Sequence, residues 1–219
     1  MMSKQFDLLI FDWDGTLMDS TAAIANSIIA SCVDMDLPVP SFAQASHIIG
    51  LGLDEAIAAL LPDLSVADYP AFTARYRHHF LGQDHLLPLF DGVMQTLPQL
   101  HAQGYWMTIA TGKSRRGLDR ALDHSQLRPY FHASRCADEL NSKPHPAMII
   151  ALMDYCAVTP ERTLMIGDTS HDLLMAQNAG VASVGVSYGA HTGESLLAYS
   201  PLYVANSFND LAQWLSLHA

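Results

Sequence analysis

The chain has 219 residues, half of them hydrophobic, which is enough to bury the core of one ordinary domain and of a smaller second one. Acidic residues outnumber lysine and arginine by 22 to 11, and the resulting net charge of −11 excludes nucleic acid and anionic lipid as general partners. An anionic substrate would also be repelled unless a local positive charge, such as a divalent cation, reversed the field.

The cysteines and the N-terminal segment indicate a reducing compartment. Cys32, Cys136 and Cys156 lie far apart without a CxxC pattern, which argues against a disulfide framework or a zinc site. The N-terminal apolar stretch is too short and too acidic for a secretion signal, and no apolar run is long enough to cross a bilayer. We therefore expect a cytoplasmic protein, as a monomer or a weak homodimer.

Short apolar runs alternate with helix-like stretches along most of the chain. The runs predict strands at Phe6–Phe11, Tyr105–Ala110, Phe131–Ser134, Thr163–Ile166, Val181–Val186 and Leu202–Ala205. The intervening patterns predict helices at Val93–Ala102, Ser114–Asp123, Pro146–Tyr155, Ser170–Asn178 and Phe208–Leu217. Strands that alternate with helices predict an α/β fold with a parallel sheet.

One region interrupts this alternation, because residues 20–83 contain no convincing strand. The apolar spacing there predicts helices at Ala22–Val33, Ser41–Ile48, Asp54–Leu61 and Ala67–Leu81. We interpret residues 19–84 as an all-helical domain inserted into a core made of residues 1–18 and 85–219. The crossings near Leu17–Asp19 and Asp84–Pro88 would be its hinges, and the insertion would act as a lid.

Polar residues follow the first two predicted strands. Asp12 and Asp14 come directly after the apolar run, before a turn at Gly15. Buried carboxylates are costly unless they are paired, hydrogen-bonded or bound to a metal. Thr111 and Gly112 follow the second strand in a turn that opens a helix, whose free amides suit a phosphate.

Further charged residues follow later elements of the sheet. Lys143 lies between prolines in the segment Ser-Lys-Pro-His-Pro, and Asp168 and Asp172 follow the fourth strand. In a parallel sheet these residues meet the first acid pair at one edge. Crowded carboxylates require a counter-charge, and oxygen ligands without cysteine or a histidine set favour Mg²⁺.

The order of these motifs resembles the haloacid dehalogenase-like hydrolase superfamily. The motifs are DWDGT, a strand ending in threonine, Lys-Pro, and Gly-Asp followed by a second aspartate. The helical insertion resembles the cap of the phosphoglycolate phosphatase and β-phosphoglucomutase branch, and the likeness covers nearly the whole chain. It implies a Rossmann-like, doubly wound parallel core with an inserted all-helical cap domain.

The resemblance also implies a role for each acid. Asp12 would be the nucleophile that forms an aspartyl-phosphate, and Asp14 would be the general acid and then the general base. Asp12 and Asp168 would give carboxylate ligands to Mg²⁺, and Asp14 would give its backbone carbonyl. Asp172 would bind the metal or orient its site.

The remaining implied roles concern the substrate. Thr111, Gly112 and Lys143 would hold the phosphoryl oxygens, with Lys143 also orienting the nucleophile. Gly50 and Leu51 belong to a loop that tends to face the substrate in the family. Arg75, Arg77, His78 and His79 form a basic patch on the last helix of the insertion, and we expect this patch to be a solvated face. The other histidines carry no ligand spacing.

These residues indicate a Mg²⁺-dependent phosphatase for a small phosphorylated metabolite, similar to phosphoglycolate phosphatase. A β-phosphoglucomutase-like phosphotransferase and a non-catalytic phosphate-binding module stay open as alternatives. Asp14 argues against a dehalogenase, and the absence of lysine from residues 20–83 argues against a phosphonate hydrolase. Sugar phosphates, nucleoside monophosphates and pyrophosphate are all open as substrates.

Overall fold

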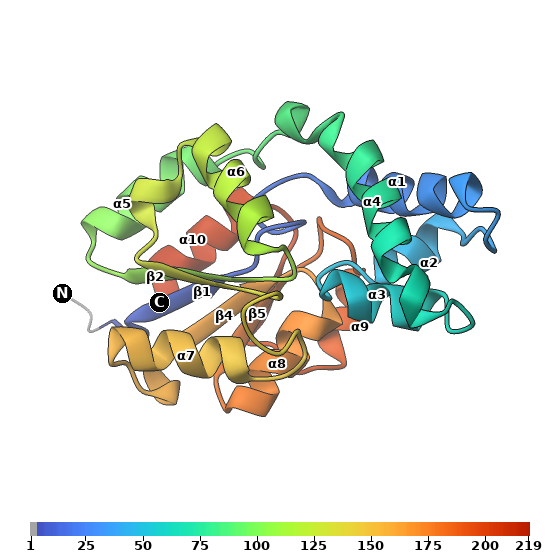
Figure 1. The fold of residues 1–219 in the computed structure, drawn as a ribbon. Helices are drawn as coiled ribbons and strands as arrows, with labels where there is room; N and C mark the ends of the chain where they lie inside the picture. Colours follow the sequence, from blue (N-terminus) through green and yellow to red (C-terminus); the bar gives the residue numbers. More distant parts are fainter. Residues whose placement is uncertain (1–3) are drawn as a thin grey trace.

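The computed structural model describes residues 4–219 and contains a single six-stranded sheet (Figure 1). All strand pairs are parallel, and the order across the sheet is β3-β2-β1-β4-β5-β6. The strands are β1 (Leu8–Phe11), β2 (Trp106–Thr111), β3 (Ala133–Cys136), β4 (Thr163–Gly167), β5 (Ala182–Val186) and β6 (Tyr203–Ala205). This order confirms the predicted doubly wound core. The direction in which successive strands are added changes between β1 and β4, and we call this place the reversal point.

Helices cover both faces of the sheet. Figure 1 shows α5 (Val93–Ala102), α6 (Arg115–Ser125) and α10 (Phe208–His218) on one face, with α7 (Ala147–Cys156) and α8 (Ser170–Ala179) on the other. The alternation of β1 divides its side chains between two apolar clusters, Leu9 and Phe11 facing the first set of helices and Leu8 and Ile10 the second. Because both faces are covered, the strand is apolar throughout.

The residues between β1 and α5 form helices, as predicted. They are α1 (Thr21–Asp34), α2 (Phe42–His47), α3 (Leu53–Leu60) and α4 (Tyr69–Leu81), and we call residues 21–81 the helical insertion. Its helices pack around an apolar cluster of their own, which includes Ile28, Ile57 and Phe72. Figure 1 shows the insertion beyond the carboxyl ends of the strands, on the side where the charged residues were expected.

The two segments that join the insertion to the sheet lie side by side. The amide of Asp19 donates to the carbonyl of Pro88 at 2.9 Å, and the amide of Phe90 donates to the carbonyl of Leu17 at 3.0 Å. Met18 and Leu89 form an isolated antiparallel bridge between them. The two predicted crossings are therefore one paired connection.

The structure differs from the predicted elements mainly at their ends. The third strand runs over Ala133–Cys136 instead of Phe131–Ser134, because a 3₁₀ turn at Arg128–Tyr130 delays it and Phe131 packs edge-on against Phe11. The five-residue helix α9 (Gly193–Leu197) was not predicted, since it is too short to show a periodic pattern.

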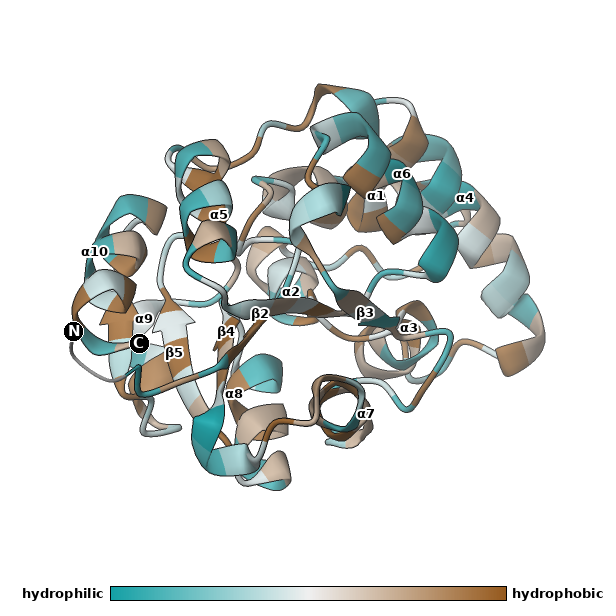
Figure 2. Ribbon diagram, turned by 90° about the vertical axis from the view of Figure 1, so that its left-hand side faces the viewer, coloured by the Kyte–Doolittle hydropathy of each residue, from teal (hydrophilic) through white to brown (hydrophobic). Residues whose placement is uncertain are grey.

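Hydropathy follows this architecture. Figure 2 shows hydrophobic residues along β4 and β5 and hydrophilic residues along much of α4 and α6. Among residues 4–219, no helix combines the length and the apolar character that a membrane crossing requires.

Candidate active site

The predicted site residues meet at the carboxyl edge of the central strands. Phe11 pairs with Ile109 of β2 and with Ile166 of β4, so the residues that follow these strands are neighbours. The amide of Asp12 continues the ladder by donating to the carbonyl of Ile166 at 2.9 Å. Asp12 and Asp168 therefore lie on either side of the reversal point, where doubly wound sheets bind their ligands.

Lys143 connects two buried carboxylates beneath this edge. Its Nζ lies 2.7 Å from Oδ1 of Asp12 and 2.6 Å from Oδ1 of Asp172, and all three side chains are almost fully excluded from solvent. Burial alone lowers the pKa of Lys143, but attraction to the two carboxylates outweighs this and raises the pKa above its usual value. The lysine is therefore charged, and it offsets one of the acids around it.

The acids outnumber this single cation. Asp12, Asp168 and Asp172 each place a carboxylate oxygen within 4.8 Å of the others. Burial raises the pKa of Asp12, with repulsion from Asp172 adding to the effect, and burial together with repulsion from Asp12 raises the pKa of Asp168. When these three carboxyl groups are ionised, their negative charge exceeds the single positive charge of Lys143.

A divalent cation fits this charge and these donors. Oδ2 of Asp12 is buried and has no hydrogen-bond partner among residues 4–219. The Asp168 carboxylate is oriented by the Thr16 hydroxyl at 3.0 Å and the Ala190 amide at 2.7 Å. Oriented carboxylate oxygens without sulfur or imidazole in the group are the donor set of a hard cation.

Asp172 also caps the N-terminus of α8. Its Oδ2 accepts a hydrogen bond from the amide of Thr169 at 3.1 Å, and its own amide donates to the hydroxyl oxygen of Thr169 at 3.4 Å; these two contacts form the capping box of α8. Oδ2 of Asp172 also accepts a hydrogen bond from the Thr169 hydroxyl at 2.7 Å. Its other oxygen contacts Lys143. Asp172 thus ties the start of α8 to the lysine that holds Asp12.

Asp14 lies apart from the acid cluster. Its Oδ1 accepts a hydrogen bond from the Ser20 hydroxyl at 2.6 Å and lies 2.9 Å from Nζ of Lys113. The turn that follows Asp14 depends on Gly15, whose φ of +78° suits glycine and whose missing Cβ leaves room for the Asp168 carboxylate. The turn expected at this glycine is present.

The turn after β2 is covered by a loop of the helical insertion. A Cβ on Gly112 would lie 2.5 Å from the carbonyl oxygens of Gly50 and Leu51. The amide of Gly52, in the same loop, donates to the hydroxyl of Ser142 at 2.6 Å. The loop that contains the two substrate candidates therefore rests directly on the expected phosphate-binding turn.

A pocket of about 470 Å³ lies between the insertion and the sheet. Its wall contains six of the predicted site residues, namely Asp12, Asp14, Thr111, Gly112, Gly50 and Leu51. Lys143, Asp168 and Asp172 do not line it and lie beneath its floor, packed around Asp12. Within the basic patch, Arg75, Arg77 and His78 are exposed as expected, and Arg77 also lines the pocket. His79 is half-buried, and its Nε2 lies 2.9 Å from Oδ2 of Asp34.

Three residues near the site were not selected from the sequence. Lys113 and Ser20 contact Asp14, and Tyr76 lines the pocket from α4. Lys113 carried a signal, because it is one of only three lysines in the chain and directly follows the Thr-Gly turn. Ser20 and Tyr76 carried none, since a serine before a helix and a tyrosine in a helix are ordinary.

Three histidines that looked scattered in the sequence meet where the insertion contacts the core. The imidazoles of His171 and His191 each lie 3.0 Å from the backbone carbonyl of His47, and the rings of His47 and His191 stack at 4.7 Å. Burial lowers the pKa of both His171 and His191. Together these contacts fix His47, at the start of the loop that covers Gly112.

Comparison with known proteins agrees with this geometry. Residues 9–186 match the family model for haloacid dehalogenase-like hydrolases. The chain is 34% identical to the probable phosphatase IndB of Dickeya dadantii, over 93% of this chain and 91% of the relative. It is 32% identical to the phosphoglycolate phosphatase of Aliivibrio fischeri, over 99% of both chains.

Solved structures show the same fold. The crystal structure of a predicted phosphoglycolate phosphatase from Haemophilus somnus superimposes with a TM-score of 0.85 at 27% identity, covering 97% of this chain and 99% of that one. A predicted phosphatase from Clostridium acetobutylicum gives 0.85 at 25% identity, covering 98% and 99%. On this evidence the chain is an enzyme that belongs to the haloacid dehalogenase-like hydrolase family.

Proposed function

We propose that the chain is a Mg²⁺-dependent phosphatase that hydrolyses a small phosphorylated metabolite, as the phosphoglycolate phosphatases among its relatives are named for doing. One observation carries the proposal. Asp12 lines the pocket with one carboxylate oxygen held by Lys143, while its other oxygen is buried without a hydrogen-bond partner in the described chain. A carboxylate fixed in this way is suited to attack an electrophile.

The proposed reaction has two steps. Asp12 attacks phosphorus, so that a bond from its carboxylate oxygen to phosphorus forms while the bond to the ester oxygen breaks. Asp14 gives its proton to the departing oxygen, and the product alcohol leaves. Asp14 then takes a proton from water, which attacks the same phosphorus and releases phosphate from Asp12.

The other residues hold the transferring group. Lys143 and the Thr111–Gly112 turn offer an ammonium, a hydroxyl and amides for the phosphoryl oxygens. Mg²⁺, when bound, would be held by the carboxylates of Asp12 and Asp168 and by the backbone carbonyl of Asp14, and would offset charge on the phosphoryl group. Asp172 adjoins this group and keeps Lys143 in place.

The helical insertion, together with its flanking residues, would be the cap of this enzyme, and the cap would span residues 19–84. It walls the pocket from above and, through Gly50 and Leu51, touches the phosphate-binding turn. Closure of such a lid excludes bulk water while the acyl phosphate exists. The paired connection at Met18 and Leu89 is the expected hinge.

The test is phosphate release from a panel of phosphorylated metabolites, measured with Mg²⁺ and with EDTA, for the unaltered protein and for Asp12→Asn. The proposal predicts metal-dependent release that Asp12→Asn abolishes. Consumption of substrate with phosphate appearing on a sugar would indicate a phosphotransferase. An absence of turnover with every compound would indicate a binding module.

A further inference from the structure

Residues 188–191, which follow β5, contact separate parts of the molecule. Tyr188 contacts the paired connection, the middle of the segment contacts Asp168, and His191 contacts the helical insertion. We call these four residues the bridging segment. None of the four lines the pocket, so the proposed reaction does not account for their contacts.

The bridging segment fits closely around Asp168. The amide of Ala190 donates to Oδ2 of Asp168 at 2.7 Å, and the amide of His191 donates to the backbone carbonyl of Asp168 at 3.3 Å. A Cβ on Gly189 would lie 2.3 Å from the same Oδ2, so this close approach requires glycine. A cation held by Asp168 would restrict the rotation of its carboxylate, and the Ala190 amide bonded to that carboxylate would be fixed with it.

His191 extends this contact to the insertion. Its side chain is buried, and its Nδ1 accepts a hydrogen bond from the amide of Ser170 at 3.0 Å. The ring proton is therefore on Nε2, which donates to the backbone carbonyl of His47 at 3.0 Å. This carbonyl ends α2, where the last carbonyls of a helix have no partner inside the helix. His171 of α8 contacts the same oxygen, so the insertion keeps one anchor when His191 is replaced.

Tyr188 anchors the other end of the bridging segment. Its hydroxyl donates to the backbone carbonyl of Thr16 at 3.0 Å, and its ring packs edge-on against Phe90 with centroids 4.6 Å apart. The hydroxyl of Thr16 donates in turn to Oδ1 of Asp168. Phe90 belongs to the expected hinge, where its amide donates to Leu17. The segment therefore links Asp168 to the hinge as well as to the insertion.

We propose that the bridging segment couples the cation site to the helical insertion, with His191 as the positioning residue, so that a divalent cation at Asp168 favours the contact of the insertion with the core. The inference rests on the cation site of the proposed function. The contacts are continuous, from the Asp168 carboxylate through the Ala190 amide to His191 and the end of α2. Because coupling between two sites is reciprocal, the contact of His191 with the insertion also strengthens cation binding.

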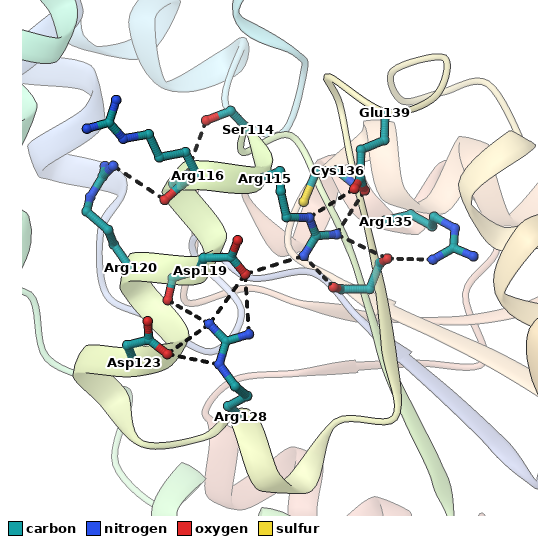
Figure 3. A network of polar contacts seen from close by, with 12 residues as sticks. Ser114, Arg115, Arg116, Asp119, Arg120, Asp123, Arg128, Arg135, Cys136 and Glu139 are labelled. Carbon is teal, nitrogen blue, oxygen red and sulfur yellow. Dashed lines mark hydrogen bonds and ion pairs between the residues drawn. The ribbon is translucent and has the colours of Figure 1, made fainter.

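The amide of Gly52 reports whether the insertion is in contact with the core. It donates across the interface to the hydroxyl of Ser142 at 2.6 Å. The loop that carries Ser142 is itself held to α6, because Arg115 makes a bidentate ion pair with Glu139, with contacts of 2.9 and 2.8 Å (Figure 3). Exchange of the Gly52 amide hydrogen with solvent therefore follows movement of the insertion.

The test is hydrogen exchange of the Gly52 amide, followed by NMR with Mg²⁺ and with EDTA. In the unaltered protein Mg²⁺ should slow this exchange by roughly 5- to 150-fold, the usual range of coupling between two sites. The affinity for Mg²⁺ is measured separately, from the rise of Tm with Mg²⁺ concentration.

Variants then assign the coupling to His191. His191→Asn keeps an acceptor for the amide of Ser170 but is too short to reach the carbonyl of His47. It should lose most of the slowing by Mg²⁺, and it should bind Mg²⁺ more weakly by up to the same factor. His191→Gln reaches further and should keep more of both effects. His79→Asn is the matched control, because His79 contacts Asp34 within the insertion, and it should behave as the unaltered protein does.

Equal slowing by Mg²⁺ in His191→Asn and in the unaltered protein would overturn the coupling. A rise of Tm with Mg²⁺ but no slowing of exchange in the unaltered protein would also overturn it, and would leave the cation site intact. If Mg²⁺ changed neither quantity, the cation site of the proposed function would itself be contradicted. Should His191→Asn fail to fold, Tyr188→Phe removes only one hydroxyl from the segment, and undiminished slowing in that variant would overturn the proposal.

Discussion

Replacing Gly112 with alanine should lower the activity of the enzyme and leave its fold intact. The new Cβ would lie 2.5 Å from the carbonyl oxygens of Gly50 and Leu51, whereas ordinary contacts begin near 3.4 Å. The covering loop must therefore withdraw by about 0.9 Å, because backbone atoms cannot rotate away as a side chain can. A displacement of about 1 Å in groups that position a substrate lowers the rate roughly 100-fold.

The assay is steady-state hydrolysis of p-nitrophenyl phosphate, with thermal unfolding measured alongside. Gly112→Ala should lose most of its kcat/KM at nearly unchanged stability, since Gly112 does not have a positive φ. The control is Gly180→Ala at the end of α8, where φ is +69° but nothing lies within 4 Å. That variant should lose about 1 kcal/mol of stability and keep its kcat/KM. Full activity in Gly112→Ala would refute the role of the loop contact.

Two further predictions concern charge. Lys143→Met leaves Asp12 and Asp172 buried without their cation, so urea unfolding should show that the free energy of unfolding falls by roughly 3–5 kcal/mol. Added Mg²⁺ should restore part of this stability. If Mg²⁺ had no effect on it, the proposed cation site would be contradicted. Asp7→Asn removes the half-exposed ion pair with Arg162, so the loss of stability at neutral pH should be small. Hydrogen bonds from Arg162 hold the pKa of Asp7 below its usual range, so this contribution is present above the pKa of the unfolded chain and disappears as the pH falls through the lower folded value. A difference between Asp7→Asn and the unaltered protein that grew in acid would contradict this assignment.

The sheet could be predicted because its strands are buried on both faces. Leu8 to Phe11 are fully buried, and such a run of apolar residues is typical of a central parallel strand. The third strand was placed two residues too early because Phe131 is apolar for another reason, its contact with Phe11. The helix at Gly193–Leu197 is held by a Thr192 cap and gives no periodic signal.

The acid cluster could be predicted because each member directly follows a strand or begins the helix after it. Contacts between the helical insertion and the core could not be predicted from the sequence. The partners of Lys113 at Phe80 and of His191 at His47 depend on how four helices fold back over the sheet. No spacing in the sequence relates such residues, since their separation along the chain bears no relation to the helix or strand period.

The most direct test of the account is to trap the acyl phosphate on Asp12. Enzyme quenched during turnover with Mg²⁺ and then reduced with borohydride would carry homoserine in place of the phosphorylated aspartate, which peptide mass spectrometry can locate. The account predicts homoserine at position 12, dependent on substrate. Rapid phosphate release without homoserine at position 12, or with homoserine at another aspartate, would contradict the assignment of Asp12 as the nucleophile.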